Sequence, residues 1–198
     1  MKRFALASVA SALTVLPAAA FAHTFGAHDA GLAHGFLHPV GGWDHLLAMV
    51  AVGLWAAQRG GAAPWLLPSA FVGAMIGGGL LGMAGFALPQ VELGIVLSVV
   101  ALGGLVALKS RLPLLASAGV VALFAVFHGF AHGTEMPTAA EPMLYGLGFA
   151  VSTASLHAAG ILSALSIRRF IEGHKGALAL RGTGALVGLA GVALMAFS

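Results

Sequence analysis

Two short segments of the sequence, residues 38–45 (HPVGGWDH) and 128–135 (HGFAHGTE), concentrate side chains of the types that bind transition metals. Together they supply four imidazoles and two carboxylates: His38, Asp44, His45, His128, His132 and Glu135. Imidazole nitrogen and carboxylate oxygen suit first-row divalent ions such as Ni²⁺, Co²⁺ and Zn²⁺. The chain contains no cysteine, which excludes thiolate metal sites and disulfides. We therefore predict a metal-ion site built from nitrogen and oxygen ligands.

The second segment has the spacing of a single helix face. His128, His132 and Glu135 follow an i, i+4, i+7 pattern, which places their side chains together on a continuous helix. Two glycines and a proline within residues 129–137 indicate that this helix loosens, so that backbone carbonyls and water would join the ligands. A capped, hydrogen-bonded helix end is the alternative interpretation.

The first segment predicts a turn followed by a helix. Asp44 and His45 are adjacent and diverge by about 100° around a helix, whereas His45 and Met49 share a face. We expect His38 to precede this helix and fold back over it, because residues 39–42 (PVGG) favour a turn. The spacing leaves open whether the two segments form one metal site or two.

Three further residues are candidates for a longer ion path. His157 lies with Thr153 on a polar stripe of the apolar stretch 142–167, where an inward-facing imidazole would relay an ion. A buried histidine that is hydrogen bonded to a neighbouring helix is the alternative. Met49 is a candidate thioether ligand, although packing explains it better. His23 would capture metal ahead of the membrane site if it became the first residue, and a solvated tail is its alternative.

Long apolar stretches must position these ligands. The chain is 60% hydrophobic and 8% charged, with a mean hydropathy of +1.01, which excludes an ordinary soluble domain. Such stretches indicate a polytopic helical membrane protein. We predict an all-α bundle that forms one domain over residues 23–198. Its six transmembrane helices are expected at residues 41–58, 65–88, 91–108, 112–131, 142–167 and 177–197.

Residues 1–22 are predicted to be a cleavable signal peptide. Lys2 and Arg3 precede an apolar core at residues 4–16, and Ala20-Phe21-Ala22 matches a small-residue cleavage site. Cleavage after Ala22 would leave His23 at the N-terminus. An uncleaved first membrane helix is the alternative, although the apolar run is short for a span.

The lysines and arginines predict how the helices are oriented in the membrane. Outside the predicted signal, all of them lie at or near the connections after the first, third and fifth helices. The positive-inside rule makes these connections cytoplasmic. Both mature termini and both metal-ligand segments are then periplasmic, in a protein of the bacterial inner membrane.

The two segments also resemble a known family. Residues 38–55 are similar to the signature of the HupE/UreJ family of bacterial nickel permeases, and residues 127–137 to that family's second characteristic segment. The predicted signal peptide and six helices match as well. The resemblance implies a secondary permease that carries nickel across the cytoplasmic membrane to supply hydrogenase or urease, with cobalt associated with some relatives. By motif position it implies that the six ligands named above are the important residues.

We therefore expect a permease rather than an enzyme, with the lipid bilayer and a divalent metal ion as its partners. Ni²⁺ is favoured by the resemblance, because ligand chemistry alone leaves Co²⁺ and Zn²⁺ open. We expect no permanently bound cofactor and no nucleotide or nucleic-acid partner, because the sequence has no nucleotide-binding motif and its few basic residues are scattered. A haem-binding membrane protein and a metal-dependent membrane enzyme are the alternatives.

Overall fold

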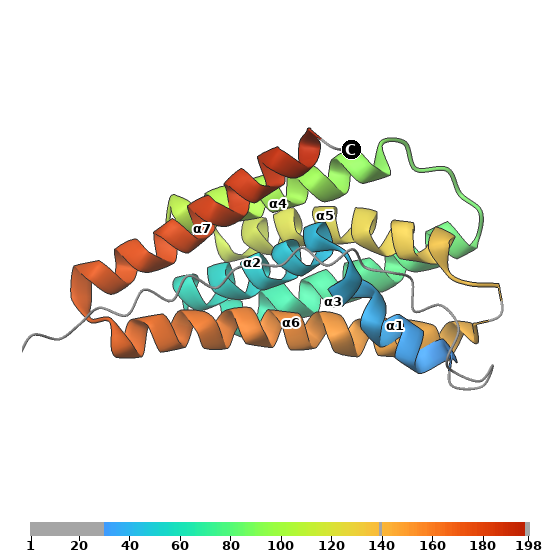
Figure 1. The fold of residues 1–198 in the computed structure, drawn as a ribbon, viewed down its shortest axis with the longest axis horizontal. Coiled ribbons are helices and arrows are strands. Elements are labelled where there is room, and N and C mark those ends of the chain that lie inside the picture. The colour runs from blue at the N-terminus through green and yellow to red at the C-terminus, as the bar shows by residue number, and fades with distance from the viewer. Residues whose placement is uncertain (1–29, 139, 197–198) are drawn as a thin grey trace, which may run out of the picture.

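A computed structural model describes residues 30–138 and 140–196, which fold into α-helices without any strand (Figure 1). The helices are α1 (Ala30–Gly41), α2 (Trp43–Arg59), α3 (Ala63–Met83), α4 (Val91–Ala107), α5 (Leu114–Glu135), α6 (Pro142–Phe170) and α7 (Gly173–Met195). The predicted all-α class is confirmed, and each of the six predicted stretches forms a helix. The predicted signal peptide and His23 lie outside the described residues.

The lengths and compositions of these helices indicate a multi-pass membrane protein. Within the described residues, α3, α5, α6 and α7 are long and apolar enough to cross a bilayer, and α1 and α2 together qualify as one span bent by 83°. Helix α4 is apolar but has 17 residues, or about 26 Å of helix against a hydrocarbon core of about 30 Å. The structure thus supports four or five membrane spans, and the sixth span stays a prediction.

Helix α1 is the element that differs most from the sequence prediction. The predicted turn at residues 39–42 is wrong for residues 39–41, which continue α1 after His38, and the chain changes direction at Gly42, whose backbone is extended (φ −103°, ψ 125°). Helix α1 packs against α6 so closely that a methyl group at Gly35 would overlap the Tyr145 carbonyl oxygen. Burial of this short helix against α6 explains why it forms, and the bend at Gly42 leaves His38 in contact with His132 of α5 and Tyr145 of α6.

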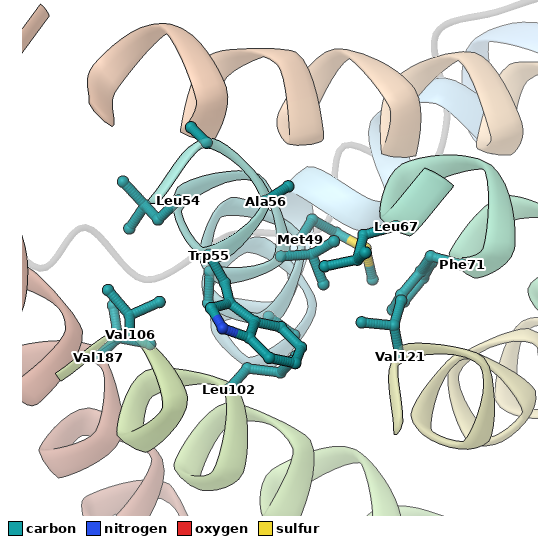
Figure 2. Packing of buried hydrophobic residues seen from close by; sticks show 14 of the residues in the cluster. Met49, Leu54, Trp55, Ala56, Leu67, Phe71, Leu102, Val106, Val121 and Val187 are labelled. Atoms are coloured by element: carbon teal, nitrogen blue, oxygen red, sulfur yellow. The ribbon is translucent and has the colours of Figure 1, made fainter. Parts of the chain in front are cut away.

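Helix α2 lies at the centre of the bundle and α3 pairs with α5, α4 with α7 and α1 with α6 around it (Figure 1). Nearly every residue of α2 from Ala48 to Ala57 is buried. A helix that is apolar all round belongs in such an interior. In Figure 2, Met49 and Trp55 of α2 point into the apolar packing between α2 and its neighbours, and the Met49 side chain lies beside Leu67.

The glycines of the second segment allow close packing and do not loosen the helix. Helix α5 is continuous to Glu135. A methyl group at Gly129 would overlap the carbonyl oxygen of Met75 in α3, and one at Gly133 would overlap that of Gly79. The predicted loosening is therefore wrong: these positions lack a side chain because the backbones of α3 and α5 touch there. A rigid α5 then holds His128 and His132 in fixed positions.

Candidate metal-ion site

The helix ends at one side of the bundle bring four of the predicted ligands into a row, which we call the histidine cluster. In order of ring contact, its members are His38 of α1, His132 of α5, His45 of α2 and His128 of α5. Ring centroids of successive members are 4.6, 4.3 and 4.5 Å apart. The two sequence segments therefore meet in one cluster.

The histidine cluster runs from the surface into the core. The side chain of His38 is 36% exposed, whereas His132 is 4% exposed and His128 is fully buried. His45, between these two in the row, is 8% exposed, so His38 is the exposed end of the row and the other three imidazoles are buried. A metal ion that entered at His38 would exchange its water ligands for imidazole nitrogens as it moved inward.

At the exposed end of the row, three residues form the tightest group of ligands. The ligand atoms of His38, His132 and Glu135 all lie within 4.8 Å of one another, and His38 Nε2 is 3.4 Å from Glu135 Oε2. One residue comes from the first segment and two come from the second. Because His128, His132 and Glu135 share one face of a continuous α5, the i, i+4, i+7 spacing places them as the sequence analysis predicts. This His38–His132–Glu135 triad could hold a divalent ion with water in its remaining positions.

A cavity of about 310 Å³ surrounds the exposed part of the cluster. We call it the metal-site cavity; the lining residues with ligand-type side chains are His38, Asp44, His45, Glu92, His132 and Glu135. Glu92 reaches it from the first turn of α4 and was not among the predicted ligands. Its position just before a long apolar stretch is the sequence signal that places it at this membrane face.

Asp44 contacts the histidine cluster through His45, whose ring it orients. Asp44 Oδ1 lies 2.8 Å from His45 Nδ1 and also accepts a 2.7 Å hydrogen bond from the His45 backbone N–H. A carboxylate only accepts, so Nδ1 carries a proton and Nε2 of a neutral ring keeps its lone pair. His45 Nε2 is buried and bonds to none of the described residues. This is the carboxylate–histidine arrangement that orients metal-binding imidazoles, and the predicted role of Asp44 as a direct ligand stays a prediction.

Ser98 plays the same orienting part for His128. The Ser98 hydroxyl donates to the Ile95 carbonyl oxygen at 2.5 Å, and the same oxygen lies 2.8 Å from His128 Nε2. A hydroxyl has one hydrogen, so His128 Nε2 must donate and Nδ1 keeps its lone pair. His128 Nδ1 is buried without a partner among residues 30–138 and 140–196. Sequence reasoning missed Ser98, although a lone hydroxyl in the apolar stretch VELGIVLSVVALGGLVA was the available signal.

The deeper nitrogens of the cluster are ready to bind a ligand. Both ring nitrogens of His132 are buried, and no described residue forms a hydrogen bond to either. A buried polar atom without a partner costs about 1–3 kcal/mol. His45 Nε2, His128 Nδ1 and whichever His132 nitrogen carries no proton would each recover that energy by binding a cation, which makes a metal ion the ligand that fits this arrangement best.

His157 lies beyond the cluster on α6. It is 1% exposed, and both ring nitrogens lack partners among the described residues. The ring of Phe71 in α3 contacts both His128 and His157, at centroid distances of 5.6 and 5.0 Å. The Phe71 side chain therefore lies between His128 of the cluster and His157, and sequence reasoning did not single this residue out.

The structure sets Met49 apart from the ligands. Met49 is fully buried one turn after His45 and belongs to the hydrophobic core, as the packing interpretation predicts. Tyr145 of α6 is an unpredicted neighbour of the site. Its ring centroid lies 6.1 Å from that of His38, and its hydroxyl is buried without a partner in the described part of the chain.

Comparison with known proteins places nearly the whole chain in one protein family. The sequence profile of the family described as HupE / UreJ protein matches residues 11–194. A relative named "Protein HupE", from Rhizobium leguminosarum bv. viciae, is 47% identical over 184 residues, which cover 93% of this chain and 94% of that protein. No solved structure matches the chain.

Proposed function

This chain belongs to the HupE/UreJ family, and from that premise we propose that it is a permease for a divalent transition-metal ion, Ni²⁺ in particular. The observation that carries the proposal is the row of four imidazoles, which passes from a half-exposed His38 to a fully buried His128 with unpartnered nitrogens along it. A resident structural site would enclose its ion with closed coordination, whereas this row offers several partial ligand sets in sequence.

Entry of the ion begins at the His38–His132–Glu135 triad. The hydrated cation exchanges some of its water for two imidazoles and a carboxylate there, and Glu92 adds negative charge to the same cavity. His132 is shared with the next pair, because its ring also contacts His45. The ion can therefore change ligands one at a time as it moves to His45 and then His128. Asp44 and Ser98 keep the receiving nitrogens deprotonated and aimed at the row.

A row of successive partial ligand sets favours transport of the metal ion over its permanent binding. Conduction requires binding that is strong enough for entry and weak enough for release at each step. Imidazoles select borderline metals such as Ni²⁺, Co²⁺ and Zn²⁺ over Ca²⁺ and Mg²⁺, which prefer oxygen ligands. The cluster has no thiolate, the ligand type that would hold such an ion most tightly.

Phe71 and His157 would form the next step of the path. The Phe71 ring contacts both histidines and carries no ligand atom, so it separates the cluster from His157. We propose that rotation of Phe71 opens this step and that His157 then receives the ion. The two unpartnered nitrogens of His157 support a relay role over the hydrogen-bonded alternative.

The direction of transport is proposed from the charges of the connections. The connections at the end opposite the histidine cluster carry Arg59, Lys109 and Arg111, and the positive-inside rule assigns them to the cytoplasm. The cluster, both mature termini and His23 would then face the periplasm, and cleavage of residues 1–22 would leave His23 near the entrance. Import across the inner membrane would supply hydrogenase or urease.

The geometry favours a permease over the two alternatives. Axial histidines of a haem lie on opposite faces of a macrocycle, whereas the rings in this cluster contact one another edge-on at 4.3–4.6 Å. A metal-dependent enzyme needs an open coordination position beside a substrate pocket. The His38–His132–Glu135 triad would also leave open positions, but its ligands continue into a buried row of further imidazoles, which suits the transfer of an ion better than a fixed catalytic centre.

Uptake of radioactive nickel by cells tests the proposal. Cells that express the unaltered chain should accumulate Ni²⁺, and His45→Ala and His132→Ala should reduce accumulation to the background of cells without the protein. His174→Ala is the matched control, because His174 is an exposed histidine at the other end of the bundle. Normal uptake by both cluster variants at equal membrane abundance would refute the proposed path. Competition by Co²⁺ and Zn²⁺ in the same assay ranks the three metals.

A further inference from the structure

The end of the bundle opposite the histidine cluster contains a second cavity, with a volume of about 540 Å³. It lies where α2, α4 and α6 end and α7 begins. We call it the basic cavity, because four cationic side chains line it: Arg59, Lys109, Arg111 and Arg168. No carboxylate is among its lining residues in the described part of the chain. The basic cavity therefore concentrates positive charge at the level where these helices end.

The four cations have no acidic partner within the protein as described. Among residues 30–138 and 140–196, the ion pairs within 4.0 Å are those of His38 with Glu135 and His45 with Asp44, both at the other end. Arg59 Nε and Nη1 are buried and donate to no described residue, and the guanidinium carbon lies 5.9 Å from the Trp55 ring centroid. Arg168 donates one 3.4 Å hydrogen bond, to the Ala57 carbonyl oxygen. Arg59 is partly buried and the other three cations are exposed, so the unpartnered Arg59 guanidinium is the group that most needs an anion, and the three neighbouring cations add to its attraction for one.

The backbone adds to the positive character of the cavity. Gly173, Gly176 and Ala177 in the first turn of α7 line it, and the Glu172 side chain makes no capping hydrogen bond to this turn. The first N–H groups of a helix have no partner within the helix and attract anions, phosphate in particular. Lys109 has a left-handed backbone (φ 53°) at the end of α4, where glycine is usual. A lysine thus occupies a backbone conformation that glycine would adopt with less strain.

We propose that the basic cavity binds a phosphate group, carried either by an anionic phospholipid or by free phosphate. Guanidinium groups pair with phosphate oxygens in a bidentate manner, and the ammonium of Lys109 adds a point charge. The residues that meet in the cavity come from the connections after α2, α4 and α6. A bound phosphate would therefore tie together three connections that otherwise repel one another. Basic pockets between membrane helices commonly bind lipid headgroups.

Thermal unfolding of the purified, delipidated full-length protein tests this site. The probes are phosphatidylglycerol and phosphatidylcholine in mixed micelles, and inorganic phosphate without lipid. The test variant is Lys109→Gln with Arg111→Gln, whose side chains make no hydrogen bond within the described structure. The matched control is Arg169→Gln with Lys175→Gln, which removes the same charges from exposed positions outside the cavity.

Phosphatidylglycerol should raise the unfolding temperature of the unaltered protein and of the control. The concentration for half of that rise should increase about 25-fold in the test variant, because each cation contributes about fivefold. Stabilisation by phosphatidylglycerol alone would identify a lipid headgroup, and stabilisation by inorganic phosphate would identify a free anion. The proposal would be overturned by no response to either anionic probe, by equal titrations of test and control variants, or by an equal response to zwitterionic phosphatidylcholine.

Discussion

The two ends of this bundle carry opposite chemistry on the same helices. Helix α2 begins beside the metal-site cavity with Asp44 and His45 and ends beside the basic cavity with Arg59. Imidazoles and carboxylates line the metal-site cavity, whereas cationic side chains and the N–H groups at the start of α7 line the basic cavity. A divalent cation therefore finds ligands at one end and repulsion at the other.

The ends also differ in how deeply their polar groups lie. The histidine cluster continues from the surface to His128, which is fully buried, so an entering ion is drawn into the core by ligands. The basic cavity stays at the level of the helix ends, where α2, α4 and α6 finish. Under the two proposals, the first end passes an ion inward and the second binds an anion at the membrane surface. Variants of each end can break or sharpen this contrast.

Loss of a shared ligand should have the largest effect. His132 belongs both to the His38–His132–Glu135 triad and to the pair with His45, so His132→Ala should weaken Ni²⁺ binding by more than about 100-fold, above the usual range for an orienting neighbour. Isothermal titration of the purified protein measures this. The metal-free unfolding temperature should fall only slightly, because the loss of ring packing is partly offset by removal of two buried nitrogens that lack partners among the described residues. A variant that bound Ni²⁺ normally would remove His132 from the path.

Removal of an orienting hydroxyl should have a smaller effect. Ser98→Ala frees the ring of His128 and allows the other nitrogen to carry the proton, so Ni²⁺ affinity should fall by about 10-fold. Ser98→Thr keeps the hydroxyl and should largely restore affinity, which separates the hydrogen bond from a general packing defect. Equal affinities for the unaltered protein and Ser98→Ala would show that the tautomer of His128 does not matter.

A change at Phe71 should separate transport from binding. Phe71→Leu keeps an apolar residue but removes the ring that contacts both His128 and His157, so the rate of nickel uptake should rise several-fold. Ni²⁺ affinity of the outer ligands should stay within about twofold, because Phe71 supplies no ligand atom. The expected loss of stability is about 1 kcal/mol, as for other conservative changes in a core. Unchanged uptake, measured at equal membrane abundance, would argue against Phe71 as the closed step.

The smallest effect is expected from neutralising the basic cavity. Lys109→Gln with Arg111→Gln should leave Ni²⁺ affinity unchanged within about twofold, because α2 alone separates the two ends by about 25 Å. Exposed charges that far apart are largely screened at a Debye length of about 8 Å. Isothermal titration of the double variant measures this. A tenfold change in affinity would mean that the two cavities act as one unit.

Local patterns predicted the helices well, and also which side chains share a face of α5, because both depend on neighbours in sequence. Apolar length identified each of the six predicted helices, and i, i+4, i+7 spacing placed His128, His132 and Glu135 on one face of α5. Local patterns failed where a distant backbone decided the outcome. Gly129 seemed to loosen α5, but it accommodates the carbonyl of Met75. Residues 39–42 were expected to form a turn, but residues 39–41 continue helix α1, which packs on α6.

By itself, the sequence determined the chemistry of this protein: nitrogen and oxygen ligands without cysteine, apolar helices to carry them, and motifs typical of its family. The tertiary structure alone decided that the two segments form a single row, that Asp44 and Ser98 orient the row's imidazoles, and that four cations meet at the opposite end. The physical reason is that a side chain's type is encoded locally. Its partners depend on which helices pack together, and here close backbone contacts between α1 and α6 and between α3 and α5 set that packing.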